Sequence, residues 1–409
     1  MGTDVGADSW ADDFAAFHAL FASVFGRREG REQAAKYMRG LMATAERHSA
    51  WQIAEATGDK IPDATQRLLY RTLWDADTAR DILLGFIVAA FGDDDGIGVV
   101  DETGFIKKGK QSVGVQRQYS GTAGKIENSQ VGTFLTYSTA KGHVFLDRRL
   151  YLPKQWCEDA ERRARAKVPD SVSFETKPEQ AMRMLEHAWE QGVPMRWVAG
   201  DEVYGDATEL RDCVRTHQRL YVLAVPNNTL LWANRPPEAE ARREREARPR
   251  AKAQLAEGVL PATTVLALAL GWPDSRWQRL TIAEGAKGPR IYDWAYQRIV
   301  ESRDRLPGPD GWLIVRRSLT DPADLAYFLS NAPADTPLLK LAQVAGNRYT
   351  IEQCFEEGKG ETGLDQYAVR YWHSWYRHIT LSMMAHAWLA SVRNKAEAQK
   401  GAPSPSWQP

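Results

Sequence analysis

The chain changes at Gly96 from helical to strand periodicity, and this change limits the folds open to it. Between residues 10 and 91, apolar residues recur at three- and four-residue spacing in WADDFAAFHALFASVF, QAAKYMRGLMATAE and TARDILLGFIVAAF. Asp77 and Thr78 are placed to cap the third of these helices. After Gly96, glycine-containing turns separate four β-rich runs, IGVVD, SVGVQRQYS, VGTFLTYST and HVFLDRRLYLP. We therefore expect a helical domain followed by a sheet.

The rest of the chain alternates helices and strands. A helix at about 178–191 is followed by a strand in MRWVAGD, a helix in ATELRDCVRTHQ and a strand in RLYVLAVP. Strands followed by such a series predict a mixed α/β layer structure. Four more strands are expected in RWQRLTIAEG, RIYDWAYQRIV, GWLIVRRSL and LAYFLSN, with helices returning at about 338–358 and 367–395.

This organisation predicts five segments. Residues 234–253 hold seven basic and four acidic residues, which is typical of a solvated spacer or an exposed helix. The final GAPSPSWQP has the composition of a disordered end. We expect a helical domain at 1–92, a mixed α/β core at 93–230, a charged linker and β-rich insertion at 231–337, C-terminal helices of the core at 338–396, and a disordered tail at 397–409.

The composition excludes several classes of protein. With 53 basic and 53 acidic residues the net charge is zero, so only a local basic patch could bind a polyanion. The three cysteines form no C-x-x-C, which argues against a disulfide framework or a zinc site and favours a reducing cytoplasm. No signal peptide and no membrane-spanning apolar stretch is present. There is also no phosphate-binding glycine motif, so no nucleotide cofactor is expected.

Two aspartates follow apolar runs in similar surroundings. Asp101 follows the run in VVDETGF and Asp201 follows the run in VAGDEVYG, and each is followed by a glutamate and then a glycine within four residues. Carboxylates at strand ends suit a hard divalent cation, and two such ions can hold the attacking and leaving oxygens of a phosphoryl transfer. A turn or cap is the commoner role of a strand-end aspartate, so the pair alone leaves both interpretations open.

A third acid lies between two cations near the C-terminus. On one helix, Arg348, Glu352 and Lys359 would share a face to within roughly 40°, and the neighbouring Ile351 and Phe355 would dock that helix on the sheet. One interpretation is an intrahelical ion pair worth a few tenths of a kcal/mol. The other is that Glu352 binds a metal ion while Arg348 and Lys359 hold phosphates.

Taken together, these blocks resemble the DDE transposases of bacterial insertion sequences, of the branch marked Y-x-x-R-x-x-x-E-x-x-x-x-x-x-K. Arg348, Glu352 and Lys359 match that spacing, whereas Ala345 occupies the tyrosine position. VVDETGF and VAGDEVYG look like the blocks with the first and second catalytic aspartates. The resemblance spans about residues 70–395.

The resemblance implies an RNase H-like core in which Asp101, Asp201 and Glu352 bind two Mg²⁺ ions, with Mn²⁺ as a substitute. It implies metal-dependent cleavage of DNA at transposon ends and strand transfer into target DNA, without a covalent enzyme intermediate. The branch commonly has a β-rich insertion between the second and third acids, which matches the four strands expected there.

The resemblance also suggests how DNA is held. The phosphate-binding set would be Arg348, Lys359, Lys107, Lys108, Lys110 and Arg117, although the loop after the first strand could equally be an ordinary solvated hairpin. A flipped base would stack on an aromatic side chain. The candidates in the insertion are Trp272, Trp277, Trp294 and Trp312, each of which is more often a core residue.

The implied partners are double-stranded DNA, as terminal inverted repeats and target, and a second copy of the chain on paired ends. The helical domain and the insertion would share end recognition, in the bacterial cytoplasm at the nucleoid. Three alternatives stay open: an RNase H-like nuclease without transposition, a domesticated and catalytically silent DNA-binding protein, and a hydrolase that uses paired carboxylates as acid and base.

Overall fold

The computed structural model describes residues 7–43, 47–237, 255, 257–285 and 288–400. The chain divides into two compact units. The first unit comprises residues 1–196 and 349–409, and the second unit comprises residues 197–348. Most of the expected charged linker and the expected tail lie outside the described residues.

The first unit begins with the predicted helices. They are α1 (Ala7–Ala19), the 3₁₀ turn η1 (Ala22–Val24), α2 (Arg28–Leu41), α3 (Ala50–Ala56), α4 (Asp63–Tyr70) and α5 (Ala76–Phe91). The cap predicted for α5 is wrong by a few residues. Asp75 is the N-cap, and its carboxylate accepts a hydrogen bond of 2.7 Å from the Thr78 backbone N–H. Asp77 instead pairs with Arg148 at 2.9 Å.

Four antiparallel strands follow, as the sequence predicted. They are β1 (Gly96–Ile106), β2 (Gln116–Ser120), β3 (Lys125–Thr139) and β4 (Gly142–Tyr151). β3 is the central strand and pairs with each of the other three. The hairpin between β3 and β4 turns at Ala140 and Lys141, and Gly142, where the sequence indicated a turn, begins β4 with a φ of 130°.

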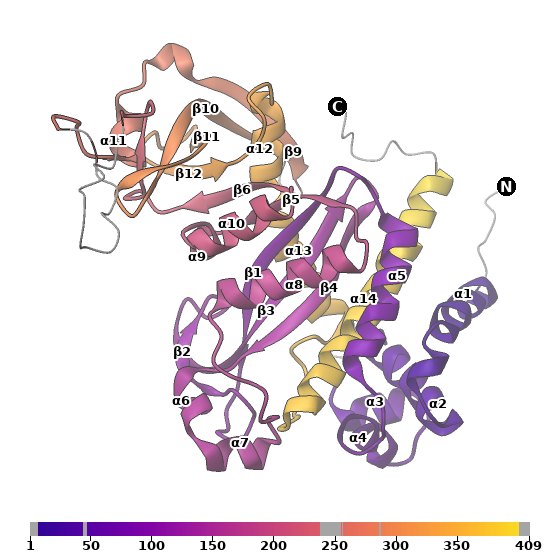
Figure 1. The fold of residues 1–409 in the computed structure, drawn as a ribbon. Helices are drawn as coiled ribbons and strands as arrows, with labels where there is room; N and C mark the ends of the chain where they lie inside the picture. Colours follow the sequence, from indigo (N-terminus) through magenta and orange to yellow (C-terminus); the bar gives the residue numbers. More distant parts are fainter. Residues whose placement is uncertain (1–6, 44–46, 238–254, 256, 286–287, 401–409) are drawn as a thin grey trace. The chain divides into compact units, whose positions relative to one another are not determined.

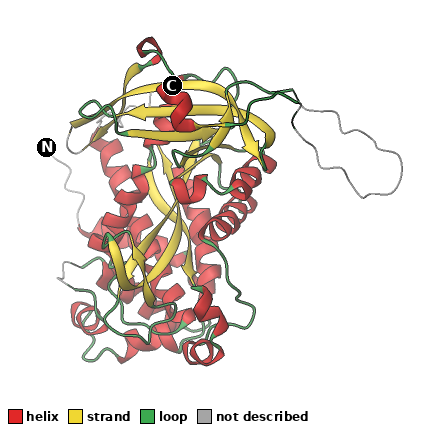
Figure 2. Cartoon of the chain, turned by 90° about the vertical axis from the view of Figure 1, so that its left-hand side faces the viewer, coloured by secondary structure: helices red, strands yellow, loops and turns green. Residues whose placement is uncertain are grey.

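Helices cover both faces of these strands (Figures 1 and 2). Thr133 and Phe134 are neighbours on β3, so their side chains point to opposite faces. Thr133 donates a hydrogen bond of 2.8 Å to Gln180 of α8 (Lys177–Glu190). Phe134 packs edge-on against Phe355 of α13 (Tyr349–Thr362), with ring centroids 5.4 Å apart. One face is therefore the α8 face and the other is the α13 face.

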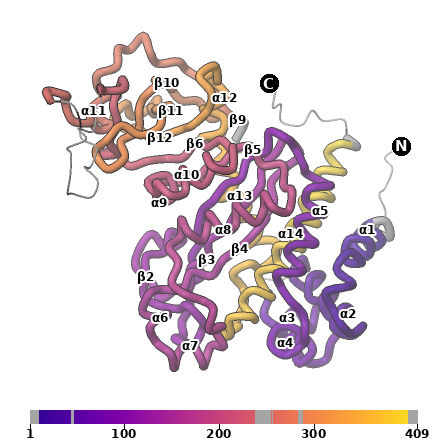
Figure 3. Tube along the Cα trace, viewed as in Figure 1, coloured from indigo at the N-terminus to yellow at the C-terminus, as the bar shows by residue number. Residues whose placement is uncertain are grey.

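The last helix, α14 (Trp372–Lys400), packs against β4, α13 and α5, and its trace can be followed in yellow beside α5 in Figure 3. Two short helices, α6 (Lys154–Glu158) and α7 (Ala160–Ala166), were not expected from the sequence. They occupy a strongly charged stretch that is anchored by the buried Trp156.

The second unit is built on one sheet. The chain enters it within β5 (Met195–Gly200), which pairs in parallel with β6 (Leu220–Val225). The helices α9 (Glu202–Gly205) and α10 (Thr208–Thr216) lie between these two strands in sequence. The order continues from β6 through β12, β11, β10 and β7 to β8, with β9 paired to β10.

The remaining elements of the second unit follow the predicted β-rich pattern. They are β7 (Leu230–Trp232), β8 (Thr263–Thr264), α11 (Val265–Leu270), the 3₁₀ turn η2 (Asp274–Arg276), β9 (Gln278–Gly285), β10 (Gly288–Arg303), β11 (Leu306–Arg317), β12 (Leu325–Ser330) and α12 (Leu338–Gly346). The strands β9, β10, β11 and β12 correspond to the four further strands that the sequence predicted before residue 331. The mixed α/β class is therefore confirmed. Within the described part of the chain, no helix is both long and apolar enough to span a membrane.

Candidate active site

Asp101 lies on the α13 face of β1. The pairing register places Asp101 opposite Phe134 and Thr103 opposite Gly132, and directly opposed residues of an antiparallel pair point to the same face. Glu102 points to the other face, where it forms an ion pair with Lys177 of α8. The half-buried Asp101 carboxylate accepts a hydrogen bond of 2.7 Å from the Glu102 backbone N–H.

The expectation that Asp101 ends a strand is wrong, because β1 continues for five more residues to Ile106. Those residues keep their pairing with β3. The polar residues after Val100 therefore mark a decrease in burial and not the end of the strand. The buried run ends at Val100, and Asp101 and Glu102 are the half-buried pair that follows. Asp101 is thus partly open to solvent within an otherwise buried strand.

The helix α13 presents a buried stripe to the sheet, formed by Ile351, Cys354, Phe355 and Gly358. A Cβ on Gly358 would lie 3.0 Å from the buried Phe145 ring, so there is little room for a larger residue. Ile351 and Phe355 had been expected to dock this helix, and both are buried.

Lys359 connects α13 to β1 on the face that carries Asp101. Its ammonium donates hydrogen bonds of 2.8 Å to Thr103 and 3.3 Å to Thr122. Burial lowers the pKa of Lys359. Glu352 is exposed and precedes Lys359 by seven residues, which places the two within roughly 20° around the helix axis. Glu352 and Asp101 therefore belong to facing sides of two packed elements, α13 and β1.

Asp201 lies in the second unit, directly after β5. It is the N-cap of α9, and its carboxylate accepts a hydrogen bond of 2.9 Å from the Val203 backbone N–H. The DEVYG block has a glycine at position 205 because no larger residue fits there. A Cβ on Gly205 would lie 1.7 Å from the Ala224 carbonyl oxygen of β6. Asp201 thus has the strand-end position that the sequence predicted, together with a capping bond.

The prediction that Arg348 shares a helix face with Glu352 and Lys359 is wrong. Arg348 is a half-buried residue of the second unit and precedes the first residue of α13, Tyr349. Asn347 and Arg348 form a turn between α12 and α13. The spacing of residues in the sequence had indicated one continuous helix across this turn. The three carboxylates come from two units, Asp101 and Glu352 from the first and Asp201 from the second.

Comparison with known proteins identifies the family. The family model described as DDE superfamily endonuclease matches residues 20–289. The chain belongs to the DDE superfamily endonucleases. This confirms the family predicted from the sequence and makes the protein an endonuclease by class. The match includes Asp101 and Asp201, whereas Glu352 and Lys359 lie beyond its end.

Other similarities are more distant. The probable transposase for insertion sequence element IS701 of Microchaete diplosiphon is 23% identical over 348 residues, covering 83% of this chain and 77% of that protein. A cryo-EM structure of the piggyBac transposase synaptic complex with hairpin DNA aligns with 98% of this chain and 75% of its own, at 11% identity and a TM-score of 0.41.

Lys107, predicted from the sequence to bind phosphate, makes contacts inside this DDE superfamily endonuclease. Its ammonium donates a hydrogen bond of 3.1 Å to the Tyr367 carbonyl and lies 3.4 Å from the centre of the Tyr367 ring. Burial lowers the pKa of Lys107 to about 8. These contacts are structural, and we leave Lys107 out of the proposed phosphate-binding set. Lys108, Lys110 and Arg117 are exposed.

The aromatic candidates of the insertion differ in exposure. Trp294 and Trp312 are buried, so neither can receive a base. Trp272 and Trp277 are half-buried, with ring centroids 6.1 Å apart. Ala345, at the signature tyrosine position, is buried in α12.

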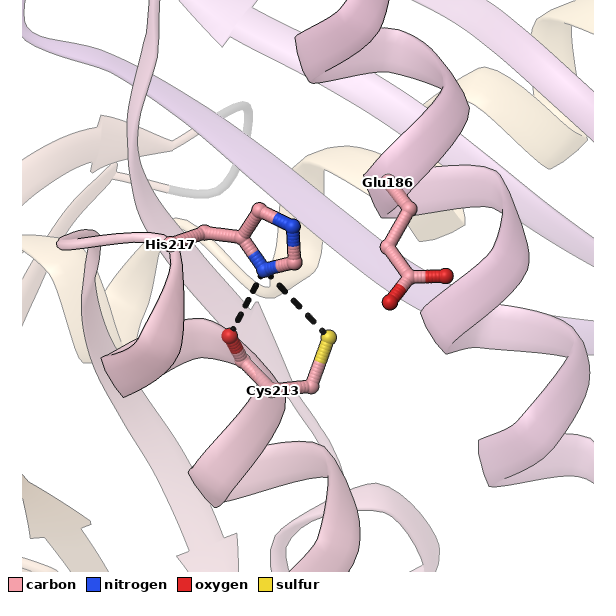
Figure 4. A group of neighbouring side chains, drawn as sticks. All are labelled: Glu186, Cys213 and His217. Carbon is pink, nitrogen blue, oxygen red and sulfur yellow. Dashed lines mark hydrogen bonds between the residues drawn. The ribbon is translucent and has the colours of Figure 1, made fainter.

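Sequence reasoning missed Thr103 and Thr122, the hydroxyls that hold Lys359, because their meeting depends on how β1 and the turn after β2 fold together. It also passed over Cys213 and His217, one helical turn apart in the second unit. The His217 ring nitrogen Nδ1 is 2.9 Å from the Cys213 carbonyl oxygen and 3.8 Å from its Sγ (Figure 4). Glu186, also drawn in Figure 4, belongs to α8 of the first unit.

Proposed function

We propose that the protein is a DNA transposase that cleaves phosphodiester bonds at transposon ends and transfers the cut strand into target DNA. The observation that carries the proposal is the register of β1, which puts Asp101 on the face that α13 covers. Membership of the DDE superfamily endonucleases and the similarity to the IS701 transposase support it.

The acids proposed to hold metal ions are Asp101, Asp201 and Glu352, and the proposed ions are two Mg²⁺, replaceable by Mn²⁺. The available donors are carboxylate oxygens, which hard divalent cations prefer, and Glu352 is exposed while Asp101 and Asp201 are half-buried. These carboxylate donors therefore fit divalent metal ions. When bound, such ions would supply Lewis acidity for activation of water or a DNA 3′-hydroxyl and for stabilisation of the leaving oxygen.

The cations of the site would position the DNA. Lys359 donates hydrogen bonds to two neutral hydroxyls, and its ammonium would also contact a phosphate beside the proposed metal site. Arg348 would contact a second phosphate. Lys108, Lys110 and Arg117 would line the path of the backbone, since each is exposed. Trp272 and Trp277 are the aromatics proposed for stacking a flipped base.

The proposed substrates are the terminal inverted repeats of the element and a target duplex, bound by two copies of the chain on paired ends. The proposed place of action is the bacterial cytoplasm at the nucleoid. An RNase H-like nuclease without transposition and a silent DNA-binding protein are the alternatives, and they differ from a transposase in the products that they form.

We would test the function with labelled DNA that carries the inverted repeats flanking the gene, in Mg²⁺ or Mn²⁺. We expect wild type to cleave at the repeat boundary and to yield hairpin or joined products. We expect Asp201→Ala to bind the same DNA and to cleave at background rate. Cleavage without joining would identify a nuclease, and binding without cleavage by both proteins would identify a silent binding protein.

A further inference from the structure

The first unit carries a basic surface centred on Tyr371, here named the Tyr371 surface. Two hollows of about 250 Å³ and 390 Å³ both include Tyr371 in their lining. The basic residues that line them are Lys110, Arg162, Arg165 and Arg370 in the smaller hollow and Arg67, Arg71 and Lys167 in the larger. Asp63 is the one acid among the described lining residues of the two hollows. Seven cations and one acid make a strongly positive surface on a chain of zero net charge.

Contacts between distant segments build this surface. The Val113 backbone N–H donates a hydrogen bond of 3.0 Å to the Arg370 carbonyl, which ties the loop after β1 to the loop between α13 and α14. Tyr70, the last residue of α4, packs edge-on against Tyr371 at 5.3 Å. The Lys167 ammonium lies 4.4 Å from the centre of the Tyr371 ring. These contacts bring the segments that carry the cations together around Tyr371.

Most of these charges are open to solvent. All seven basic residues except Arg162 are exposed. Arg162 is half-buried, with its guanidinium 3.9 Å from the centre of the Trp156 ring. Arg165 has an exposed partner in Glu161 at 3.5 Å, and such a pair is worth little. Within the described residues, no ion pair neutralises Arg67, Arg71 or Lys110.

We propose that the Tyr371 surface binds the phosphate backbone of a DNA duplex away from the reacting bond. This rests on the proposed function. The occupant is argued from charge complementarity, because several exposed cations with almost no acid between them match a polyanion. The loop that carries Arg370 and Tyr371 continues from α13, the helix of Glu352 and Lys359. Backbone contacts of this kind fix the register of the DNA without reading its sequence.

The test measures the binding of the full-length protein to a fluorescent duplex of arbitrary sequence over a range of salt concentrations, without divalent metal. The variant is Arg67→Gln/Arg71→Gln/Arg370→Gln. The matched control is Arg27→Gln/Lys60→Gln/Arg196→Gln, which removes the same charge from exposed positions of the first unit outside both hollows. Thermal unfolding checks that both variants fold.

We expect the surface variant to bind at least about 10-fold more weakly at low salt. Its slope of log affinity against log salt should be shallower by about 2 to 3 than that of the wild type, because each lost phosphate contact removes roughly 0.9 from the slope. The control should keep the wild-type slope. An equal loss in both variants, or an unchanged slope in the surface variant, would overturn the proposal.

This binding experiment and the cleavage assay in Mg²⁺ or Mn²⁺ together separate this proposal from the proposed function. If wild type cleaves the repeat DNA and the surface variant keeps the wild-type slope, the proposal that the Tyr371 surface binds DNA is wrong and the transposase assignment stands. If wild type binds no duplex at all, both proposals fail.

Discussion

At the scale of single residues, the positions that sequence reasoning identified have separate roles in the structure. Asp101 and Lys359 are brought to one side of the sheet, whereas Lys107 is held against Tyr367. Lys107 and Tyr367 are 260 residues apart in sequence. No local pattern around Lys107 could have predicted that burial, since the loop has the composition of a solvated hairpin.

Lys107 yields a prediction on pH dependence. Its pKa is about 8 in the folded state and 10.5 ordinarily, so the unfolded chain binds more protons between these values, and stability should rise with pH across that interval. In Lys107→Met this contribution should be absent. From pH 8 to pH 10.5, we expect the free energy of unfolding of the wild type to rise by on the order of 2 kcal/mol relative to that of the variant. Urea unfolding measures this difference. A parallel pH profile for both proteins would contradict the burial of this ammonium.

At the scale of elements, the prediction succeeded where a periodic pattern extends over a whole strand or helix. The strands β1 to β4 and β9 to β12 follow β-rich runs of the sequence, and they were found. The helices α6 and α7 were missed because each is short, with five and seven residues, and lies in a strongly charged stretch. Tertiary contacts such as those of the buried Trp156 stabilise them.

The helix α13 offers a matched pair of glycines. A Cβ on Gly358 would meet Phe145 at 3.0 Å and Leu364 at 3.2 Å, whereas one on Gly360 would meet nothing within 4 Å. Both neighbours of Gly358 are fully buried and cannot move freely. We expect Gly358→Ala to destabilise the fold by about 1 kcal/mol or more and Gly360→Ala to stabilise it by up to about 1 kcal/mol. Urea unfolding measures both, and equal effects would show that α13 is not seated on the sheet as described.

At the scale of the whole molecule, the family and the mixed α/β class could be predicted from the sequence, but the geometry of the site could not. Asp101 was expected at a strand end and lies inside β1, because antiparallel pairing with β3 continues past the polar residues. Arg348 was placed on α13 and lies in a turn of the second unit. The Tyr371 surface arises only when distant segments converge, and the zero net charge conceals it.

We propose that Asp101, Asp201 and Glu352 together hold divalent metal ions. We would measure Mn²⁺ binding by electron paramagnetic resonance in wild type, Asp101→Asn and Glu352→Gln. Asp94→Asn would serve as a control at an exposed acid before β1. We expect wild type and the control to bind Mn²⁺ alike, and each site variant to lose most of that binding while remaining folded. Unchanged Mn²⁺ binding in Asp101→Asn and Glu352→Gln would contradict it.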